Sequence, residues 1–254
     1  MSAPRTARER VREEMTAEIL AAAGERVAKE GAAALSLRSV ARDLGMAPSA
    51  LYRYFDGRDA LLSALILHAY ESLAAEAEQA AEQAGARPTP PAERTPPTPP
   101  TPPTETGSLG DAERFLVVPR AIRRWAVAHP HEWGLIFGTP VPGYEAPEDT
   151  VEPYARIAAA MMRPVVEADT AGRLGADLRQ RAVREELRDA VSPVAEGLFP
   201  DLPTVSVVLA IQAWTTLVGI ISLEVFGHWR NTILSPEEFF EATIRDLAAR
   251  IRLS

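Results

Sequence analysis

The sequence of 254 residues contains no cysteine. This absence excludes a disulfide-stapled scaffold, a thiolate nucleophile and a zinc or iron site built on cysteine. The chain also contains no G-x-S-x-G, no G-x-x-x-x-G-K-[ST] and no H-E-x-x-H, so it lacks the signatures of a hydrolase nucleophile elbow, a phosphate-binding loop and a zincin helix. The sequence therefore gives no support to an enzyme, and it predicts no cofactor and no metal site.

A secretory leader and an uninterrupted apolar run are also missing. Residues 1–12 are polar and rich in arginine, which is typical of a short basic arm and not of a signal peptide. The most apolar stretch runs from Val205 to Phe226, but Gln212, Thr216 and Glu224 interrupt it and no basic flank anchors it. We expect a buried helix there, no membrane span and a cytoplasmic protein.

Basic residues are in the minority, and the formal net charge is −8. Such a charge argues against a protein that coats nucleic acid along its whole length. Residues 1–60, however, hold ten Arg or Lys and nine Asp or Glu, so the acidic excess lies in the rest of the chain. This asymmetry allows one end of the protein to contact DNA while the acidic remainder limits nonspecific binding.

Apolar residues recur at helical spacing through the N-terminal part of the sequence. From Ile19 to Val27 they recur every four positions, and Leu37–Leu44 follows an i, i+3, i+4, i+7 pattern. A third short helix is expected at about Pro48–Phe55, and a longer one begins near Arg58 with a leucine-rich stripe. No stretch of this region alternates like a strand, so we predict an all-α fold.

A Pro/Thr-rich insertion occupies residues 87–107. Proline removes backbone donors and fixes φ, so neither helix nor sheet can form there, and we expect a disordered surface insertion. A docking ligand for a partner domain is the alternative. Helical patterns follow the insertion at 112–128, 131–137, 151–168, 178–191, 203–226 and 236–252.

The pattern divides the chain into a small and a larger part. We predict a DNA-binding domain of three helices at residues 13–73 and a C-terminal helical domain at 110–254. Ser235, Pro236 and Glu238 give the last helix a start signal, because they fit an N-cap, an N1 proline and an N3 glutamate.

Residues 36–55 form a candidate helix-turn-helix. A tight turn at Gly45 joins two short helices, of which the second would enter the major groove. On a helical wheel Leu51 and Phe55 face the core, while Ser49 and Arg53 share the opposite face. A recognition helix needs this division of its surface.

Each exposed side chain of the motif suits a contact with DNA. Arg53 can reach guanine O6 and N7, Ser49 a base edge or a phosphate, and Ala50 a thymine methyl. Phosphate contacts are expected from four further residues: Arg38, Tyr52, Tyr54 and Arg58. The alternative is that the tyrosines only pack between helices and the arginines are ordinary solvated residues.

The run from Leu35 to Leu62, LSLRSVARDLGMAPSALYRYFDGRDALL, resembles the DNA-binding signature of the TetR family of transcriptional regulators. Two positions depart from the family pattern. Ala47 stands where Ser is frequent, so the recognition helix lacks a side-chain N-cap, and Arg58 stands where Lys is usual. The resemblance implies a sequence-specific regulator of transcription that binds double-stranded operator DNA, most often as a repressor.

The C-terminal part resembles TetR-type regulators with a WHG ligand domain. This resemblance implies an all-helical ligand-binding domain with a pocket for a small-molecule effector, and a homodimer formed through the last two long helices. Aromatic and histidine residues are the candidates for the pocket, although packing in the core is the alternative for each of them. They are Trp125, His129, Trp133, Phe137, Trp214 and His228.

A metal site at His129, His131 and Glu132 is the one other constellation near these residues. Pro130 interrupts the helix between the two histidines, so the three side chains need not converge, and helix capping and packing are favoured instead.

Three functions remain open on the sequence alone. The leading hypothesis is a homodimeric repressor released from a palindromic operator by a small molecule. An all-α enzyme acting on a hydrophobic substrate would need a convergent acid, base or nucleophile that the sequence does not supply. An interaction protein would use the Pro-rich insertion to recruit a partner, and deletion of residues 88–104 would remove its only activity.

Overall fold

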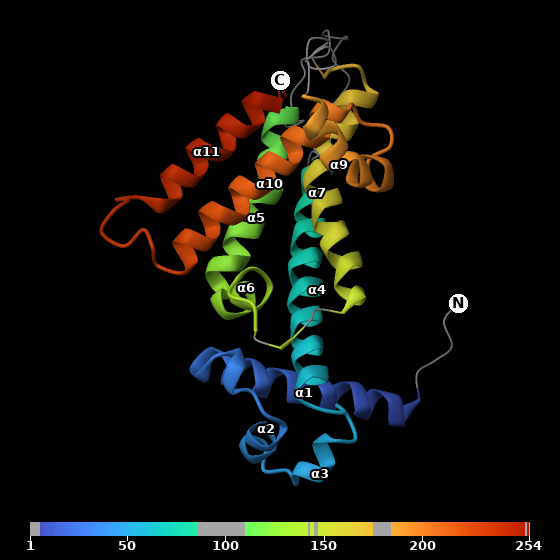
Figure 1. Cartoon of the computed structure of the whole chain (residues 1–254), viewed down its shortest axis with the longest axis vertical. Helices are drawn as coiled ribbons and strands as arrows, with labels where there is room; N and C mark the ends of the chain where they lie inside the picture. Colours follow the sequence, from blue (N-terminus) through green and yellow to red (C-terminus); the bar gives the residue numbers. More distant parts are fainter. Residues whose placement is uncertain are drawn as a thin grey trace, which may run out of the picture. The chain divides into compact units, whose positions relative to one another are not determined.

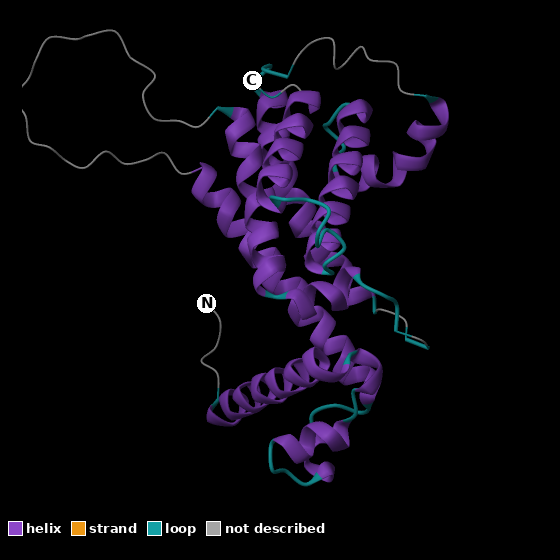
Figure 2. Ribbon diagram, turned by 90° about the vertical axis from the view of Figure 1, so that its left-hand side faces the viewer, coloured by secondary structure: helices purple, strands orange, loops and turns teal. Residues whose placement is uncertain are grey.

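The computed structural model describes residues 6–85, 110–141, 143–144, 147–174, 184–251 and 253. Within these ranges the regular structure is helical and contains no strand (Figure 2). The predicted all-α fold is confirmed. The predicted insertion at 87–107 and part of the helix predicted at 178–191 lie outside the described residues.

The chain divides into two compact units (Figure 1). The first unit contains residues 1–74 and 126–154, and the second contains residues 75–125 and 155–254. The DNA-binding domain predicted at 13–73 falls within the first unit. The C-terminal domain predicted at 110–254 is divided, because residues 126–154 belong with the N-terminal helices.

The first unit begins with α1 (Ala7–Glu30). Its first turn is closed by a capping box, in which the Thr6 hydroxyl accepts a hydrogen bond from the Glu9 amide and the Glu9 carboxylate accepts one from the Thr6 amide at 2.7 Å. The basic arm predicted at 1–12 is therefore wrong from residue 7 onward, because this cap lets the helix start before its apolar face begins.

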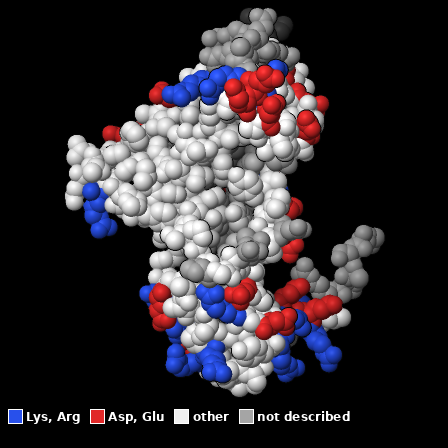
Figure 3. Space-filling view, in the orientation of Figure 1, with Lys and Arg blue, Asp and Glu red and all other residues white. Residues whose placement is uncertain are grey.

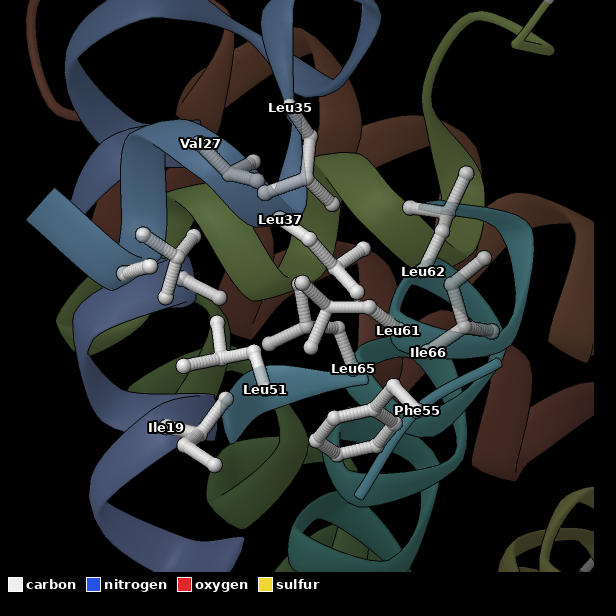
Figure 4. Close-up of a cluster of buried hydrophobic side chains, with 13 residues drawn as sticks. Ile19, Val27, Leu35, Leu37, Leu51, Phe55, Leu61, Leu62, Leu65 and Ile66 are labelled. Atoms are coloured by element: carbon white, nitrogen blue, oxygen red, sulfur yellow. The ribbon is translucent and has the colours of Figure 1, made fainter. Parts of the chain in front are cut away.

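The remaining elements of the first unit surround the core that α1 helps to form. They are α2 (Leu37–Asp43), α3 (Pro48–Leu51), the first half of α4 (Arg58–Gly85) and α6 (Pro130–Phe137). Figure 4 shows the apolar side chains that these helices bring together, among them Ile19, Leu37, Leu51 and Leu65, each at most 5% exposed. The apolar stripe predicted for α1 is buried here, as are most of those predicted for α2 and α4; Leu44 at the end of the α2 stripe is half-buried and packs against the cluster.

Segments after α5 complete the core of this unit. Leu135 of α6 and Tyr144 in the loop behind it pack against the cluster of N-terminal helices. The Tyr144 hydroxyl also lies 3.0 Å from the Ser63 hydroxyl of α4. These contacts explain why residues 126–154 belong to the same unit as the helix-turn-helix.

The second unit contains the rest of α4 together with α5 (Asp111–Ala128), α7 (Val151–Thr170), α9 (Glu185–Leu198), α10 (Thr204–Val225) and α11 (Pro236–Ile251). The residues of α5 and α7 nearest the boundary belong to the first unit. The helix predicted at 178–191 is described from residue 185 and continues to 198, about two turns beyond the predicted end. The start signal of the last helix is confirmed, because the Ser235 hydroxyl accepts a hydrogen bond from the Glu238 amide at 3.3 Å.

Ion pairs fix α5 against the two last helices. Arg123 forms two hydrogen bonds to Glu224 of α10, at 2.7 and 2.8 Å, and Arg120 forms two to Glu241 of α11, both at 2.8 Å. These bonds lower the pKa of Glu241 and raise that of Arg123. Forked pairs of this kind define the geometry between helices as well as adding attraction.

Helix α10 is long and apolar enough to cross a membrane on length and composition alone. Half of its most apolar window is buried inside this chain, where Val207, Ala213, Leu217 and Ile221 face the core. The expected buried helix is present in this position. Its other face remains exposed and includes Leu223, which is 43% exposed.

Candidate nucleic-acid interface

The turn between α2 and α3 depends on one glycine. Ser36 caps α2 by accepting a hydrogen bond from the Ser39 amide at 3.2 Å. At the other end Gly45 has φ of 64°, a left-handed conformation that favours glycine. The Gly45 amide bonds to the Arg42 carbonyl at 3.2 Å and the Met46 amide to the Ala41 carbonyl at 2.8 Å, which together form a Schellman motif.

Helix α3 is shorter than predicted. It covers Pro48–Leu51, and Ala47 at its N-cap makes no side-chain hydrogen bond, as its methyl group requires. The backbone nevertheless continues to coil, because the Tyr54 amide bonds to the Leu51 carbonyl at 2.9 Å and the Phe55 amide bonds to the same carbonyl at 3.0 Å. A tightened last turn of this kind is common at helix ends.

Because the backbone continues to coil, residues 48–55 have one buried and one exposed face, as the helical wheel predicts. Leu51 is fully buried and Phe55 is 8% exposed. Ser49 and Arg53 are exposed, and Tyr52 is 51% exposed. The structure therefore places the apolar pair in the core and presents a hydroxyl, a phenol and a guanidinium to solvent.

Ala50 and Tyr54 lie between these faces and are half-buried. Tyr54 packs against the core cluster, and the Arg12 guanidinium lies 5.7 Å from the centre of its ring. The ring is thus held between the core and α1, in the geometry of a cation–π contact. This contact also places the first turns of α1 beside the end of the recognition segment.

The two remaining predicted arginines differ in their surroundings. Arg38 is exposed on α2. Arg58 is half-buried, donates a hydrogen bond to the Ala32 carbonyl at 3.2 Å and pairs with Asp59 at 3.0 Å. Arg58 therefore ties the start of α4 to the turn that follows α1, a contact that the sequence alone did not reveal.

Further ion pairs brace the motif from behind. Arg26 of α1 forms two hydrogen bonds to Asp43 at the end of α2, both at 2.9 Å, and pairs with Glu30 of its own helix at 2.8 Å. These bonds hold the pKa of Asp43 below its ordinary value. Figure 3 shows Lys and Arg on the surface at the end of this unit that carries α2 and α3, with Asp and Glu beside them.

The residues predicted to bind a ligand are divided between the units. His129, Trp133 and Phe137 lie in the first unit, and Trp125, Trp214 and His228 in the second. Trp133 is fully buried, and its ring packs against that of Phe137 at an angle of 47° with ring centres 4.4 Å apart. Trp125 is 5% exposed, whereas the two histidines are exposed.

Sequence reasoning missed two partners of this aromatic group. The Tyr70 ring meets Phe137 and Tyr154 edge to face, with centres 6.3 Å apart in both cases. Burial raises the pKa of the Tyr70 hydroxyl. Tyr70 falls one turn beyond Ile66 on the predicted stripe of α4, so its position on the buried side could have been found from periodicity. Within the described ranges no group of three His, Asp or Glu side chains could hold a metal ion.

Comparison with known proteins decides what kind of molecule carries this motif. Residues 19–65 match the family model of bacterial regulatory proteins of the tetR family, and residues 116–247 match the Tetracyclin repressor-like C-terminal domain. The chain belongs to the TetR family. The HTH-type transcriptional regulator Rv1816 of Mycobacterium tuberculosis is similar to it, with 33% identity over 249 residues, which cover 94% of this chain and 92% of the relative.

Solved structures agree with this TetR-family assignment. The regulatory protein SCO4313 is 33% identical, with a TM-score of 0.71 and coverage of 96% of this chain and 98% of that one. PfmR of Thermus thermophilus is 17% identical with a TM-score of 0.53 and shows the fold alone. The chain is a transcriptional regulator with a DNA-binding domain and not an enzyme. The WHG subtype stays a prediction.

Proposed function

We propose that this TetR-family regulator is a homodimeric repressor that binds a palindromic operator and leaves it when a small molecule binds. The observation that supports this most directly is the exposed face of the recognition segment. Ser49, Tyr52 and Arg53 point to solvent there while Leu51 and Phe55 anchor the backbone in the core.

In the proposed complex α3 and the turn after it enter the major groove. Arg53 donates its fork to guanine and Ser49 contacts a base edge, so these two residues carry sequence preference. Arg38 on α2 and Tyr52 contact phosphates and set the position of the motif on the duplex. Tyr54 and Arg58 are held by Arg12 and Ala32, so we assign them a supporting role beside any phosphate contact.

The proposed dimer forms through α10 and α11. Leu223 and Phe226 near the end of α10 are 43% and 44% exposed, and Phe239 of α11 is 46% exposed. Phe239 stacks edge to face on Trp229 at 5.4 Å, which extends the apolar surface between the two helices. A second copy would cover this surface, as expected for a soluble cytoplasmic protein.

A dimer also supplies the two recognition helices that a palindrome requires. Release then follows if an effector favours a conformation in which the two helices no longer match the spacing of the half-sites. The aromatic group of Trp133, Phe137 and Tyr70 is a candidate for part of the effector site, because it lies in the same unit as the helix-turn-helix.

The test uses operator DNA selected from a random pool and measured by fluorescence anisotropy. The double variant Tyr52→Ala, Arg53→Ala should lose operator binding while its circular dichroism and dimer mass stay unchanged. Arg188→Ala, an exposed arginine on α9, serves as the control and should bind as tightly as wild type. Operator affinity retained in the double variant would show that the site assignment is wrong.

A further inference from the structure

A groove of about 910 Å³ lies in the first unit, and the aromatic residues considered above are not among those that line it. One wall is the face of α1 from Glu9 to Ala28. The opposite wall consists of Leu65 and His68 of α4 and of five residues in and just before α6, which are Ala128, Pro130, His131, Glu132 and Leu135. All of these residues belong to the same compact unit. A volume of this size is typical of sites that bind small molecules.

The groove is hollow because the α1 wall carries small side chains. Ala17, Ala21, Gly24 and Ala28 follow one another at helical spacing along it, and each of them lines the groove. A Cβ atom built on Gly24 meets nothing within 4 Å. The floor between the walls is apolar and includes Leu65, which is 5% exposed.

The rim of the groove carries an excess of negative charge. Four glutamates line it, Glu9, Glu13, Glu25 and Glu132, against the single guanidinium of Arg12. The capping hydrogen bonds with Thr6 lower the pKa of Glu9, so that carboxylate remains ionised at neutral pH.

Other charged groups on the rim also have partners. Lys29 pairs with Glu25 at 3.2 Å, which offsets one of the negative charges. Arg12 lies over the Tyr54 ring. Glu132, in the first turn of α6, is half-buried and lines the groove on the wall opposite α1.

We propose that this groove binds a small lipophilic cation. Its apolar floor would take up the hydrophobic body of the ligand, and the acidic rim would favour a positive over a negative charge. The site is distinct from the aromatic candidates, because Trp133 and Phe137 do not line the groove. Binding there does not depend on whether the protein represses transcription, and it is measured without DNA.

Tetraphenylphosphonium and tetraphenylborate form a suitable pair of probes, since they share one shape and carry opposite charges. Isothermal titration calorimetry on the full-length protein at neutral pH should show saturable binding of the cation and binding of the anion weaker by at least about tenfold. A cation that does not bind, or an anion that binds as tightly, would overturn the proposal.

Substitutions locate the binding in the groove. Gly24→Leu and Ala21→Leu place a large side chain in the open space, and each should weaken binding of the cation at least about tenfold. Leucine is a better helix former than glycine, so Gly24→Leu should not unfold α1. Ala75→Leu, at an exposed position of α4 outside the groove, is the control for added bulk.

Removal of charge provides an independent readout. Glu132→Gln should reduce the affinity for the cation and bring it closer to the affinity for the anion. Glu14→Gln, at an exposed position of α1 outside the groove, should change neither affinity. If both leucine variants fold like wild type and bind the cation with unchanged affinity, the groove is not the site.

Discussion

Replacement of Arg38 and replacement of Arg53 by alanine should weaken DNA binding by this protein in different ways. Both are exposed, but Arg53 lies on the face of the recognition segment and Arg38 lies on the preceding helix. A base contact by Arg53 contributes about 1–3 kcal/mol of binding free energy. A dimer on two half-sites should therefore lose about 2–6 kcal/mol, together with most of its preference for guanine. A phosphate contact by Arg38 carries no sequence preference.

The two effects separate in the salt dependence of binding. Each phosphate contact contributes about 0.9 to the slope of log K against log salt, so Arg38→Ala in a dimer should reduce the slope by about 1.8. Arg53→Ala should leave the salt slope closer to that of wild type. It should weaken binding to the matched operator more than binding to an operator with mutated bases. The assay is fluorescence anisotropy at several salt concentrations with matched and mutated operators.

Arg58→Ala gives an internal comparison, because Arg58 already bonds to Ala32 and Asp59. Its replacement should lower the thermal stability of the first unit and change the salt slope less than Arg38→Ala does. If Arg53→Ala weakens binding to all DNA sequences equally, Arg53 does not read a base. If Arg38→Ala leaves the salt slope unchanged, Arg38 does not contact a phosphate.

Three further outcomes follow from the structure. Leu223→Arg, which puts a charge on the exposed face of α10, should shift the protein from dimer to monomer in sedimentation experiments, and a dimer of unchanged stability would contradict the proposed interface. Gly45→Ala should cost about 1–2 kcal/mol in urea unfolding, because φ of 64° strains alanine while its Cβ meets no neighbour; an unchanged midpoint would refute this. Arg120 lowers the pKa of Glu241 in the folded chain below the ordinary value of 4.5, so the stability from this pair is fully present above pH 4.5 and is lost as the pH falls from there through the lower pKa of the folded chain. The free energy of unfolding measured by urea titration should therefore fall less for Glu241→Gln than for wild type between neutral and acid pH. An equal fall for both proteins would show that this carboxylate does not contribute to the acid dependence.

The positions of most helices could be predicted because their apolar residues repeat at helical spacing. The stripes of α1, α2 and α4 and the start signal at Ser235 specify buried faces and ends locally. The end of α3 could not be predicted from the helical wheel. The apolar and polar faces of residues 48–55 are the same whether the last turn has α-helical or tighter backbone hydrogen bonds. The early start of α1 depends on the hydrogen bonds between Thr6 and Glu9, which the apolar pattern does not reveal.

The site could be predicted in part for a similar reason. Leu51 and Phe55 alternate with Ser49 and Arg53 within two turns, so one sequence window contains both faces. The contact of Arg58 with Ala32 and that of Arg12 with Tyr54 join residues at least 26 positions apart, and nothing in their local sequence indicates them. The groove beside α1 likewise needs α6, which is about 100 residues further along the chain.

The most direct test of the proposed function is selection of bound DNA from a random pool by the full-length protein. The enriched sequences should share an inverted repeat whose half-sites are spaced by about one helical turn or a multiple of it. The Tyr52→Ala, Arg53→Ala variant should enrich no such sequence. A pool without any enriched motif, or the same motif enriched by the double variant, would contradict the claim that this face of the helix-turn-helix recognises an operator.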